Sequence, residues 1–476
     1  MIEVPNESTG QRARKTGPGT GRPVPSPGLP GSVKRTARYG KGVTDTAAAP
    51  EPTAAPSAAP AHDEPLEVLE APAVVAKPLL TPREGVPEVI ADAAGLAEAV
   101  ARFAAGSGPV AVDAERASGF RYGQRAYLVQ LRRAGAGTAL IDPIALPDLS
   151  GLASALGDTE WVLHAASQDL PCLRELHFTP SALFDTELGG RLAGYPRVGL
   201  GPMIEELLGY HLEKGHSADD WSTRPLPAPW LTYAALDVEL LVDLRDAVNA
   251  ELVAQGKLEW ARQEFEAVRT APPAEPRAEP WRRTSGVHRV RKARNLAVVR
   301  ALWLRRDELA RRRDMAPGRV LPDAAIIEAA TKLPKTVHLL RALPGYSGRT
   351  RSADAVSYFA ALEAALALPE RELPHHPPRS DAPPPAKSWE RSDPEAAARL
   401  AVARPAVTAI ADEHRVPTEN LLLPDLVRRL CWAPPADLDD EVVAAYLRNG
   451  GARPWQVELT AHVLAAALRR AAAHVI

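Results

Sequence analysis

The chain has 476 residues, a formal net charge of −2 and 45% hydrophobic residues, which is enough for more than one folded core. Its only cysteines, Cys172 and Cys431, exclude a disulfide-stapled secreted scaffold and a thiolate zinc site. The first residues do not form a signal peptide, and no apolar run reaches the ~18 residues of a membrane span. We therefore expect a soluble, cytoplasmic protein without a membrane partner.

The N-terminal region stands out by composition. The chain has 47 prolines among its 476 residues, which is about twice the ~5% of average proteins. Residues 1–80 alternate Gly/Pro/Arg and Ala/Pro runs without apolar periodicity, so we predict a disordered tail there. Its basic first half could bind a partner, but a solvated extension is the favoured interpretation. Residues 269–280 and 369–388 are also proline-rich and are predicted to be linkers.

Residues 81–268 are predicted to form an α/β domain. The apolar runs GPVAVDAE, RAYLVQLRR and TALIDPI indicate strands, the first two joined by a loop at Ala117–Arg125. A helix (DLSGLASALGD), another strand (WVLHAA) and a helix with Pro171 in its first turn follow. The chain from there to Gln255 is predicted to be mostly helical. Strands followed by alternating elements favour the α/β class.

Acidic residues lie at the ends of two of these strands. Asp113 and Glu115 are two positions apart on a strand, so both side chains point to one face. Two neighbouring acids repel each other and become favourable around a cation, which suggests a hard-metal site, although D-x-E alone often occurs by chance. Asp169 follows His164 at a strand-to-helix turn, where it could equally be an acid that favours the helix dipole.

A third acidic position lies inside a helix. Tyr233 and Asp237 are four residues apart and therefore lie on the same helix face. The alternative is a core tyrosine beside an exposed aspartate. Leu236 and Leu240 already supply an apolar stripe to this helix, which weakens that alternative.

Together these segments resemble the DEDD superfamily of 3′→5′ exonucleases in its tyrosine-containing branch, and most of all the ribonuclease D family. The loop DWSTRPL (Asp220–Leu226) resembles the one that precedes the third family motif. The motifs D-x-E, H-x-x-x-x-D and Y-x-x-x-D fall on Asp113 and Glu115, His164 and Asp169, and Tyr233 and Asp237. The resemblance implies a ribonuclease H-like domain with a mixed sheet flanked by helices.

The resemblance also implies a two-metal chemistry. Two divalent ions can activate a water and neutralise the charge of a phosphodiester, and oxygen ligands suit Mg²⁺ or Mn²⁺. Tyr233 would orient the attacking water, whereas His164 is predicted to be a structural hydrogen-bonding residue. The implied metal ligands are Asp113, Glu115, Asp169 and Asp237.

Four further acidic residues compete for these roles and are interpreted structurally. Asp185 is predicted to cap a helix or to support the site from behind. Asp219 and Asp220 are predicted turn and cap residues, and Asp142 a strand-end turn residue. The sequence contains no G-x-x-x-x-G-K-[ST] loop, so we expect no ATP as a partner.

The region after the first linker is strongly basic. Residues 281–320 contain twelve Arg and one Lys against three acids, a local charge of +10. Binding of phosphates is the simplest use of such a run, and Arg311, Arg312 and Arg313 are the candidate nucleic-acid-binding residues. A solvated helix face is the alternative, weakened because the run has a single sign.

Two small all-α domains are predicted in the C-terminal half. Residues 281–368 resemble the helicase-and-RNase-D C-terminal (HRDC) domain. The resemblance rests on Leu302-Trp303, Arg306-Asp307 and the Leu343-Pro344-Gly345 turn. Residues 389–476 are predicted to be a second HRDC-like domain, in which the tryptophans are core residues.

The resemblance implies a metal-dependent 3′→5′ exoribonuclease that trims RNA 3′ ends, such as those of tRNA precursors or other structured RNA, as a monomer. The alternatives are a DNA 3′→5′ exonuclease of repair and a non-catalytic nucleic-acid-binding protein on an exonuclease scaffold. The last is disfavoured, because a degenerate site would be expected to lose at least one of the four carboxylates or the tyrosine.

Overall fold

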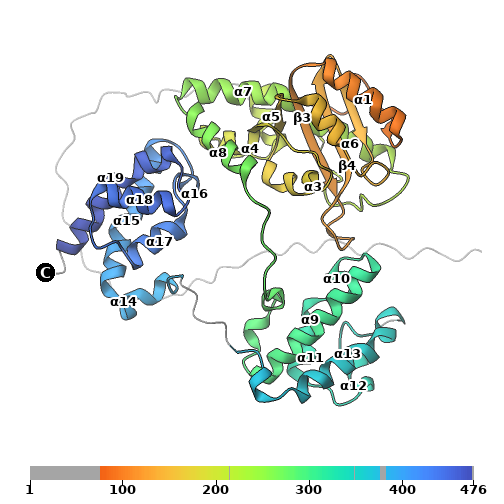
Figure 1. The fold of residues 1–476 in the computed structure, drawn as a ribbon, viewed down its shortest axis with the longest axis vertical. Helices are drawn as coiled ribbons and strands as arrows, with labels where there is room; N and C mark the ends of the chain where they lie inside the picture. The colour runs from red at the N-terminus through yellow and green to blue at the C-terminus, as the bar shows by residue number, and fades with distance from the viewer. Residues whose placement is uncertain (1–75, 214, 348, 376–381, 474–476) are drawn as a thin grey trace, which may run out of the picture. The chain divides into compact units, whose positions relative to one another are not determined.

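The structure is a computed structural model that describes residues 76–213, 215–347, 349–375 and 382–473 (Figure 1). The predicted tail, residues 1–80, therefore lies almost wholly outside the described residues. All described residues belong to one compact unit, Ala71–Ile476. No helix within these ranges has both the length and the apolar character that crossing a membrane requires.

A six-stranded mixed sheet forms the centre of the first domain, with the strand order β2-β5-β4-β3-β6-β7. β3, β4 and β5 pair antiparallel, whereas β2, β6 and β7 add parallel pairings. The strands are β2 (Val89–Ile90), β3 (Ser107–Arg116), β4 (Ala126–Ala134), β5 (Gly137–Ile141), β6 (Glu160–Leu163) and β7 (Ala182–Asp185). The predicted strands and the loop between the first two are confirmed.

Helices cover both faces of this sheet (Figure 1). One core contains Val110 and Val112 of β3 together with Phe103 and Leu152 of two helices, and a second core takes Ala111 of the same strand. The helices are α1 (Ala93–Ala105), α2 (Ser150–Leu156), α3 (Leu170–Arg174), α4 (Thr186–Ala193), α5 (Leu200–Leu208), α6 (Ala228–Glu239), α7 (Leu241–Ala254) and α8 (Leu258–Thr270). The predicted mixed sheet flanked by helices is therefore confirmed.

Four short strands were not predicted, and one of them is β2, at the edge of the six-stranded sheet. β7 interrupts the segment that was expected to be helical, and β8 (Tyr210–Leu212) does so again. β8 pairs in parallel with β1 (Lys77–Leu79), which lies inside the range predicted as tail. Strands of two to four residues show too little alternation to be recognised, and their pairing depends on partners far away in the sequence.

The C-terminal half is helical, as predicted, and contains two successive groups of helices. In each group a long helix leads to a one-turn helix, then to two further helices and a last long one. The first group is α9 (Ala293–Arg313), α10 (Pro317–Val320), α11 (Asp323–Lys332), α12 (Val337–Arg341) and α13 (Arg349–Ala367). The second is α15 (Pro394–Glu413), α16 (Thr418–Leu421), α17 (Pro424–Trp432), α18 (Asp440–Asn449) and α19 (Pro454–Ala473), preceded by α14 (Trp389–Ser392).

The tryptophans of the second group belong to its core, as expected. Trp389 and Trp455 are buried, and Trp432 packs partly buried against the same cluster. The rings of Trp389 and Trp455 are therefore not available as stacking platforms for bases.

Candidate active site

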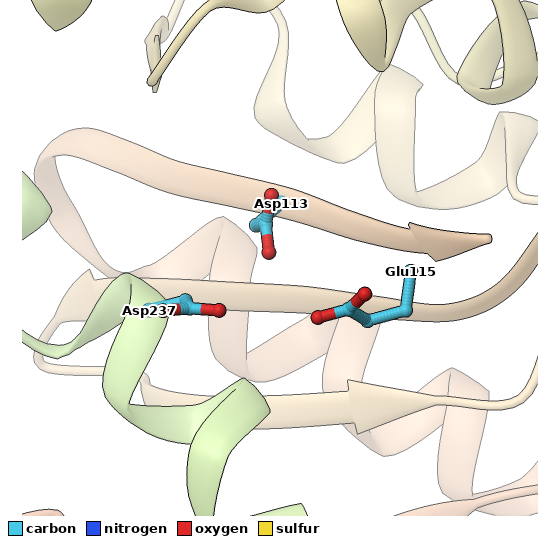
Figure 2. A group of neighbouring side chains, drawn as sticks. All are labelled: Asp113, Glu115 and Asp237. Carbon is cyan, nitrogen blue, oxygen red and sulfur yellow. The ribbon is translucent and has the colours of Figure 1, made fainter. Parts of the chain in front are cut away.

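Three of the predicted carboxylates converge at the centre of the first domain. One oxygen each of Asp113, Glu115 and Asp237 lies within 4.8 Å of the others. Figure 2 shows the three side chains pointing toward one another. Asp113 and Glu115 come from the end of β3, and Asp237 comes from α6. The predicted alternation on β3 thus places both acids on the face that α6 approaches.

Asp169 lines the same cavity, which has a volume of about 530 Å³, but it is not part of this three-residue group. Its buried carboxylate is paired with Arg116, at 3.4 Å from Asp169 Oδ1 to Arg116 Nη2. It lies at the turn between β6 and α3, as predicted. The structure therefore brings all four predicted ligands to one cavity, three of them within mutual reach of a single ion.

The turn that presents Asp169 is held by Asp185. The buried carboxylate of Asp185 accepts hydrogen bonds from the backbone N–H groups of Ala165 at 3.0 Å and Ala166 at 2.8 Å. It also caps α4 by accepting from Glu187 N and Leu188 N. Ala165 has a φ of 61°, a left-handed conformation that is uncommon for a residue with a Cβ. Asp185 thus has both of the roles predicted for it: it caps α4, and it supports from behind the turn that presents Asp169.

The four carboxylates have raised pKa values, because they are buried and close to one another. Burial and the charges of Asp113 and Asp237 raise the pKa of Glu115 to about 10, and burial followed by the charge of Asp113 raises the pKa of Asp169 to about 8. Burial also raises the pKa values of Asp113 and Asp237. A divalent cation would remove this cost, and a donor set made only of carboxylate oxygens fits a hard ion such as Mg²⁺.

Tyr233 lies one turn before Asp237 on α6 and lines the cavity. Burial, followed by the charges of Asp237 and Glu115, raises its pKa above the ordinary value, and a hydrogen bond to Asp237 acts in the same direction. The phenol is therefore protonated at neutral pH. It can orient a bound group through its hydroxyl, but it is a poor acceptor of a proton.

His164 lines the cavity and is fixed by a hydrogen-bond relay. The Thr186 hydroxyl donates to the Leu163 carbonyl, so its oxygen accepts from His164 Nδ1, at 2.9 Å. Burial lowers the pKa of His164 to about 4. The imidazole is thus neutral and held in place, in line with the structural role expected for it.

The remaining acids have partners that suit the turns in which they lie. Asp142 accepts from Arg224 Nε at 2.7 Å, which ties the Asp220–Leu226 loop to the end of β5. Asp219 pairs with His216, and Asp220 accepts from the backbone N–H of Ser222. None of these contacts leads to the four carboxylates.

Arg116 is the cavity residue that the sequence reasoning missed. It is the only Lys or Arg among the described residues that line the cavity. Strict alternation would direct Arg116 to the face of β3 opposite to that of Glu115. Arg116 is the last residue of the strand, however, and the pairing becomes irregular there because β4 has one extra residue, Tyr127, between the partners of Glu115 and Arg116. Its position directly after D-x-E was the available signal, and an irregular strand end cannot be recognised from a period of two.

The three candidate arginines at the end of α9 have different surroundings and lie outside the cavity. Arg311 Nη2 donates to the Tyr122 hydroxyl at 3.1 Å. Arg313 makes two hydrogen bonds to Asp354, at 2.7 and 2.6 Å. Arg312 is exposed. Only part of the basic run is thus committed to contacts within the chain.

Comparison with known families agrees with these features. A 3′-5′ exonuclease model matches residues 87–253, and an HRDC domain model matches residues 295–355. A model described as a 3′ to 5′ exonuclease C-terminal domain matches residues 382–468. The resemblance drawn from the three motifs is thereby confirmed.

Individual relatives cover most of the chain. A ribonuclease D from Gluconacetobacter diazotrophicus is 30% identical over 339 residues, which are 69% of this chain and 82% of the relative. A crystal structure of a protein from Bifidobacterium adolescentis is 40% identical with a TM-score of 0.78, covering 83% of this chain and 100% of that one. The crystal structure of Escherichia coli RNase D, described as an exoribonuclease involved in structured RNA processing, is 27% identical with a TM-score of 0.60, covering 80% and 98%. The chain belongs to the ribonuclease D family of 3′→5′ exoribonucleases.

Proposed function

We propose that this exoribonuclease trims the 3′ ends of structured RNA, tRNA precursors in particular, one nucleotide at a time. The observation that carries the proposal is the convergence of Asp113, Glu115 and Asp237, with Asp169 and Tyr233 on the walls of the same cavity. The cavity volume of about 530 Å³ falls in the range of small-ligand sites, about 300–1,000 Å³. A cavity of this size can hold one terminal nucleotide.

We propose that Asp113, Glu115, Asp169 and Asp237 hold two divalent ions, Mg²⁺ or Mn²⁺. When bound, such ions lower the pKa of a coordinated water and neutralise charge on the attacking and leaving oxygens. The role of the chain is to fix this arrangement. Asp113 and Glu115 are set by β3, Asp237 is set by α6, and Asp169 is set by the turn that Asp185 holds.

Tyr233 is proposed to be the residue that orients the attacking water. Its raised pKa keeps the hydroxyl protonated, so it can donate one hydrogen bond and accept another. In this role it fixes the direction of attack without removing a proton.

The helical part of the chain is proposed to hold the body of the RNA. Residues 281–320 have a local charge of +10, and Arg311, Arg312 and Arg313 lie at the end of a long helix. We propose that residues 389–476 form a second HRDC-like domain, since the order of long and short helices from α9 to α13 recurs from α15 to α19.

We also propose that the enzyme acts in the cytoplasm as a monomer that needs no ATP. The four proposed metal ligands and Tyr233 line a single cavity of the chain, and the sequence contains no phosphate-binding loop for a nucleoside triphosphate. Cys172 and Cys431 are free and buried, which suits a reducing compartment.

A trimming assay tests the proposal. Purified protein is incubated with a 5′-labelled tRNA that has a 3′ extension and with single-stranded DNA of matched sequence, each with Mg²⁺, with Mn²⁺ and with EDTA. We expect a ladder of RNA products that differ by one nucleotide, and no ladder in EDTA. Preferential trimming of the DNA would overturn the RNA assignment, and equal activity in EDTA would overturn the metal assignment.

A further inference from the structure

We propose that Arg116 is a phosphate-binding residue of this site. In this assignment its guanidinium binds the phosphodiester that joins the terminal nucleotide to the rest of the RNA. The inference rests on the proposed function, because it assumes that an RNA 3′ end enters the cavity. It adds a cationic contact for the substrate, which the carboxylates cannot provide.

The first support is the position of the side chain. Arg116 is the last residue of β3, directly after Glu115, and it lines the same cavity as the four carboxylates. Its Nη2 atom lies 3.4 Å from Asp169 Oδ1, and its side chain is 27% exposed. The guanidinium is therefore at the carboxylates and still open to a ligand.

The second support is a small neighbouring cavity of about 180 Å³. It is lined by Ser118–Phe120 of the β3–β4 loop and by Ser217–Asp219. Arg116, Ala114, Glu115 and Ser217 line both this cavity and the larger one. An RNA chain that continued from the larger cavity into the smaller one would thus pass Arg116 at the linkage between its last two nucleotides.

The third support is charge. The described residues that line the two cavities include six acids, and Arg116 is the only Lys or Arg among them. A phosphodiester that approaches these acids is repelled, so a cation that belongs to the protein is valuable there. A guanidinium has five N–H donors in a planar fork that matches two phosphate oxygens. Its ion pair with Asp169 leaves most of these donors for a phosphate. The six acids are Asp113, Glu115, Asp169, Glu213, Asp219 and Asp237.

The competing explanation is that Arg116 only neutralises Asp169. The two explanations differ in one expectation. If Arg116 binds the last phosphodiester, the loss of RNA affinity on replacing Arg116 depends on the charge of that phosphodiester; if Arg116 only neutralises Asp169, it does not. Arg116→Gln removes the charge and keeps a polar side chain, and Arg116→Lys keeps the charge without the fork. Arg102→Gln is the matched control, because Arg102 is exposed on α1 and lines neither cavity.

The experiment is a binding cycle in EDTA, so that it does not depend on turnover. Affinities are measured for three fluorescent oligoribonucleotides. One is unmodified, one has a neutral methylphosphonate in place of the last phosphodiester, and one has it in place of the phosphodiester before the last. We expect Arg116→Gln to weaken binding of the unmodified RNA by about tenfold, the lower limit for a hydrogen bond to a charged group. We expect the methylphosphonate at the last linkage to weaken RNA binding by wild type by a similar factor. The same modification should hardly change RNA binding by Arg116→Gln.

Three results would support or overturn the assignment. Partial recovery by Arg116→Lys, with unchanged binding by Arg102→Gln, supports it. An equal penalty from the last-linkage methylphosphonate in wild type and Arg116→Gln overturns it, as does unchanged binding of the unmodified RNA by Arg116→Gln. If wild type trims RNA but the last-linkage methylphosphonate weakens wild type and Arg116→Gln equally, only the Arg116 assignment is refuted. If wild type fails to trim any RNA, the proposed function is refuted.

Discussion

Replacing Glu115 by Gln should stabilise the protein when divalent ions are removed. Glu115 has carboxylate neighbours within 4.8 Å, and two unit charges at that distance interact by about 3 kcal/mol at an effective dielectric constant of ~20. Proton uptake relieves part of this repulsion, so we expect a net gain of about 1–2 kcal/mol at pH 8.5. For a domain of this size, that gain raises the midpoint of thermal unfolding by about 2–8 °C.

The pH dependence follows from the direction of the shifts. The pKa of Glu115 is raised from 4.5 to about 10, and that of Asp169 from 3.8 to about 8. A carboxyl group whose pKa is higher in the folded state binds more protons there than in the unfolded state. Its contribution is complete at pH values below its unfolded pKa and is lost as the pH rises through the folded pKa. In EDTA, wild type should therefore lose stability between about pH 5 and pH 9, and Glu115→Gln should lose less.

Thermal unfolding of both proteins, in EDTA and in Mg²⁺ at pH 5.5 and 8.5, measures these effects. Glu98→Gln is the control, because Glu98 is an exposed glutamate on α1. We expect Glu115→Gln to exceed wild type at pH 8.5 in EDTA, with little difference at pH 5.5. Mg²⁺ should stabilise wild type more than the variant. A variant that is less stable than wild type at pH 8.5 in EDTA would refute the reasoning that repulsion at this site favours an ion.

The other predictions concern Tyr233, Asp185 and Arg312. Tyr233→Phe should lower kcat by at least about tenfold while RNA affinity stays unchanged, and an unchanged kcat would contradict the water-orienting role. Asp185→Ala should cost about 2–3 kcal/mol in urea unfolding, because four backbone N–H groups lose their acceptor. Neutralising Arg311, Arg312 and Arg313 together should weaken RNA binding and flatten its salt dependence. Most of that change is expected from Arg312→Gln, with a slope change of about one, and an unchanged slope would indicate a merely solvated helix end.

Much of the acidic site was predictable because two of its three motifs lie in regular elements. Asp113 and Glu115 obey the two-residue period of a strand, and Tyr233 and Asp237 obey the four-residue spacing of a helix. Their types and spacing identify the faces on which they lie. That these faces meet around one cavity followed only from the family resemblance, since sequence spacing does not determine how β3 and α6 pack.

The residues that were missed depend on irregular or long-range structure. Arg116 lines the cavity from the last position of β3, where the pairing with β4 becomes irregular, and no periodic pattern predicts the direction of a side chain there. Asp185 was expected to cap a helix or to support the site, but the groups it supports, Ala165 and Ala166, lie about twenty positions away and could not be identified from the sequence. The pairing of β1 with β8 joins segments more than a hundred residues apart and gives an even weaker signal.

The most direct test of the central claim is the Mg²⁺-dependent trimming of a 3′-extended tRNA by wild type and by Asp113→Ala. Asp113 belongs to the three-carboxylate group, and its side chain faces both Glu115 and Asp237. The account predicts that wild type shortens the RNA in single-nucleotide steps and that Asp113→Ala does not, although it still binds the RNA. Equal trimming by parallel preparations of the two proteins would contradict the account, because the activity would then come from outside this site.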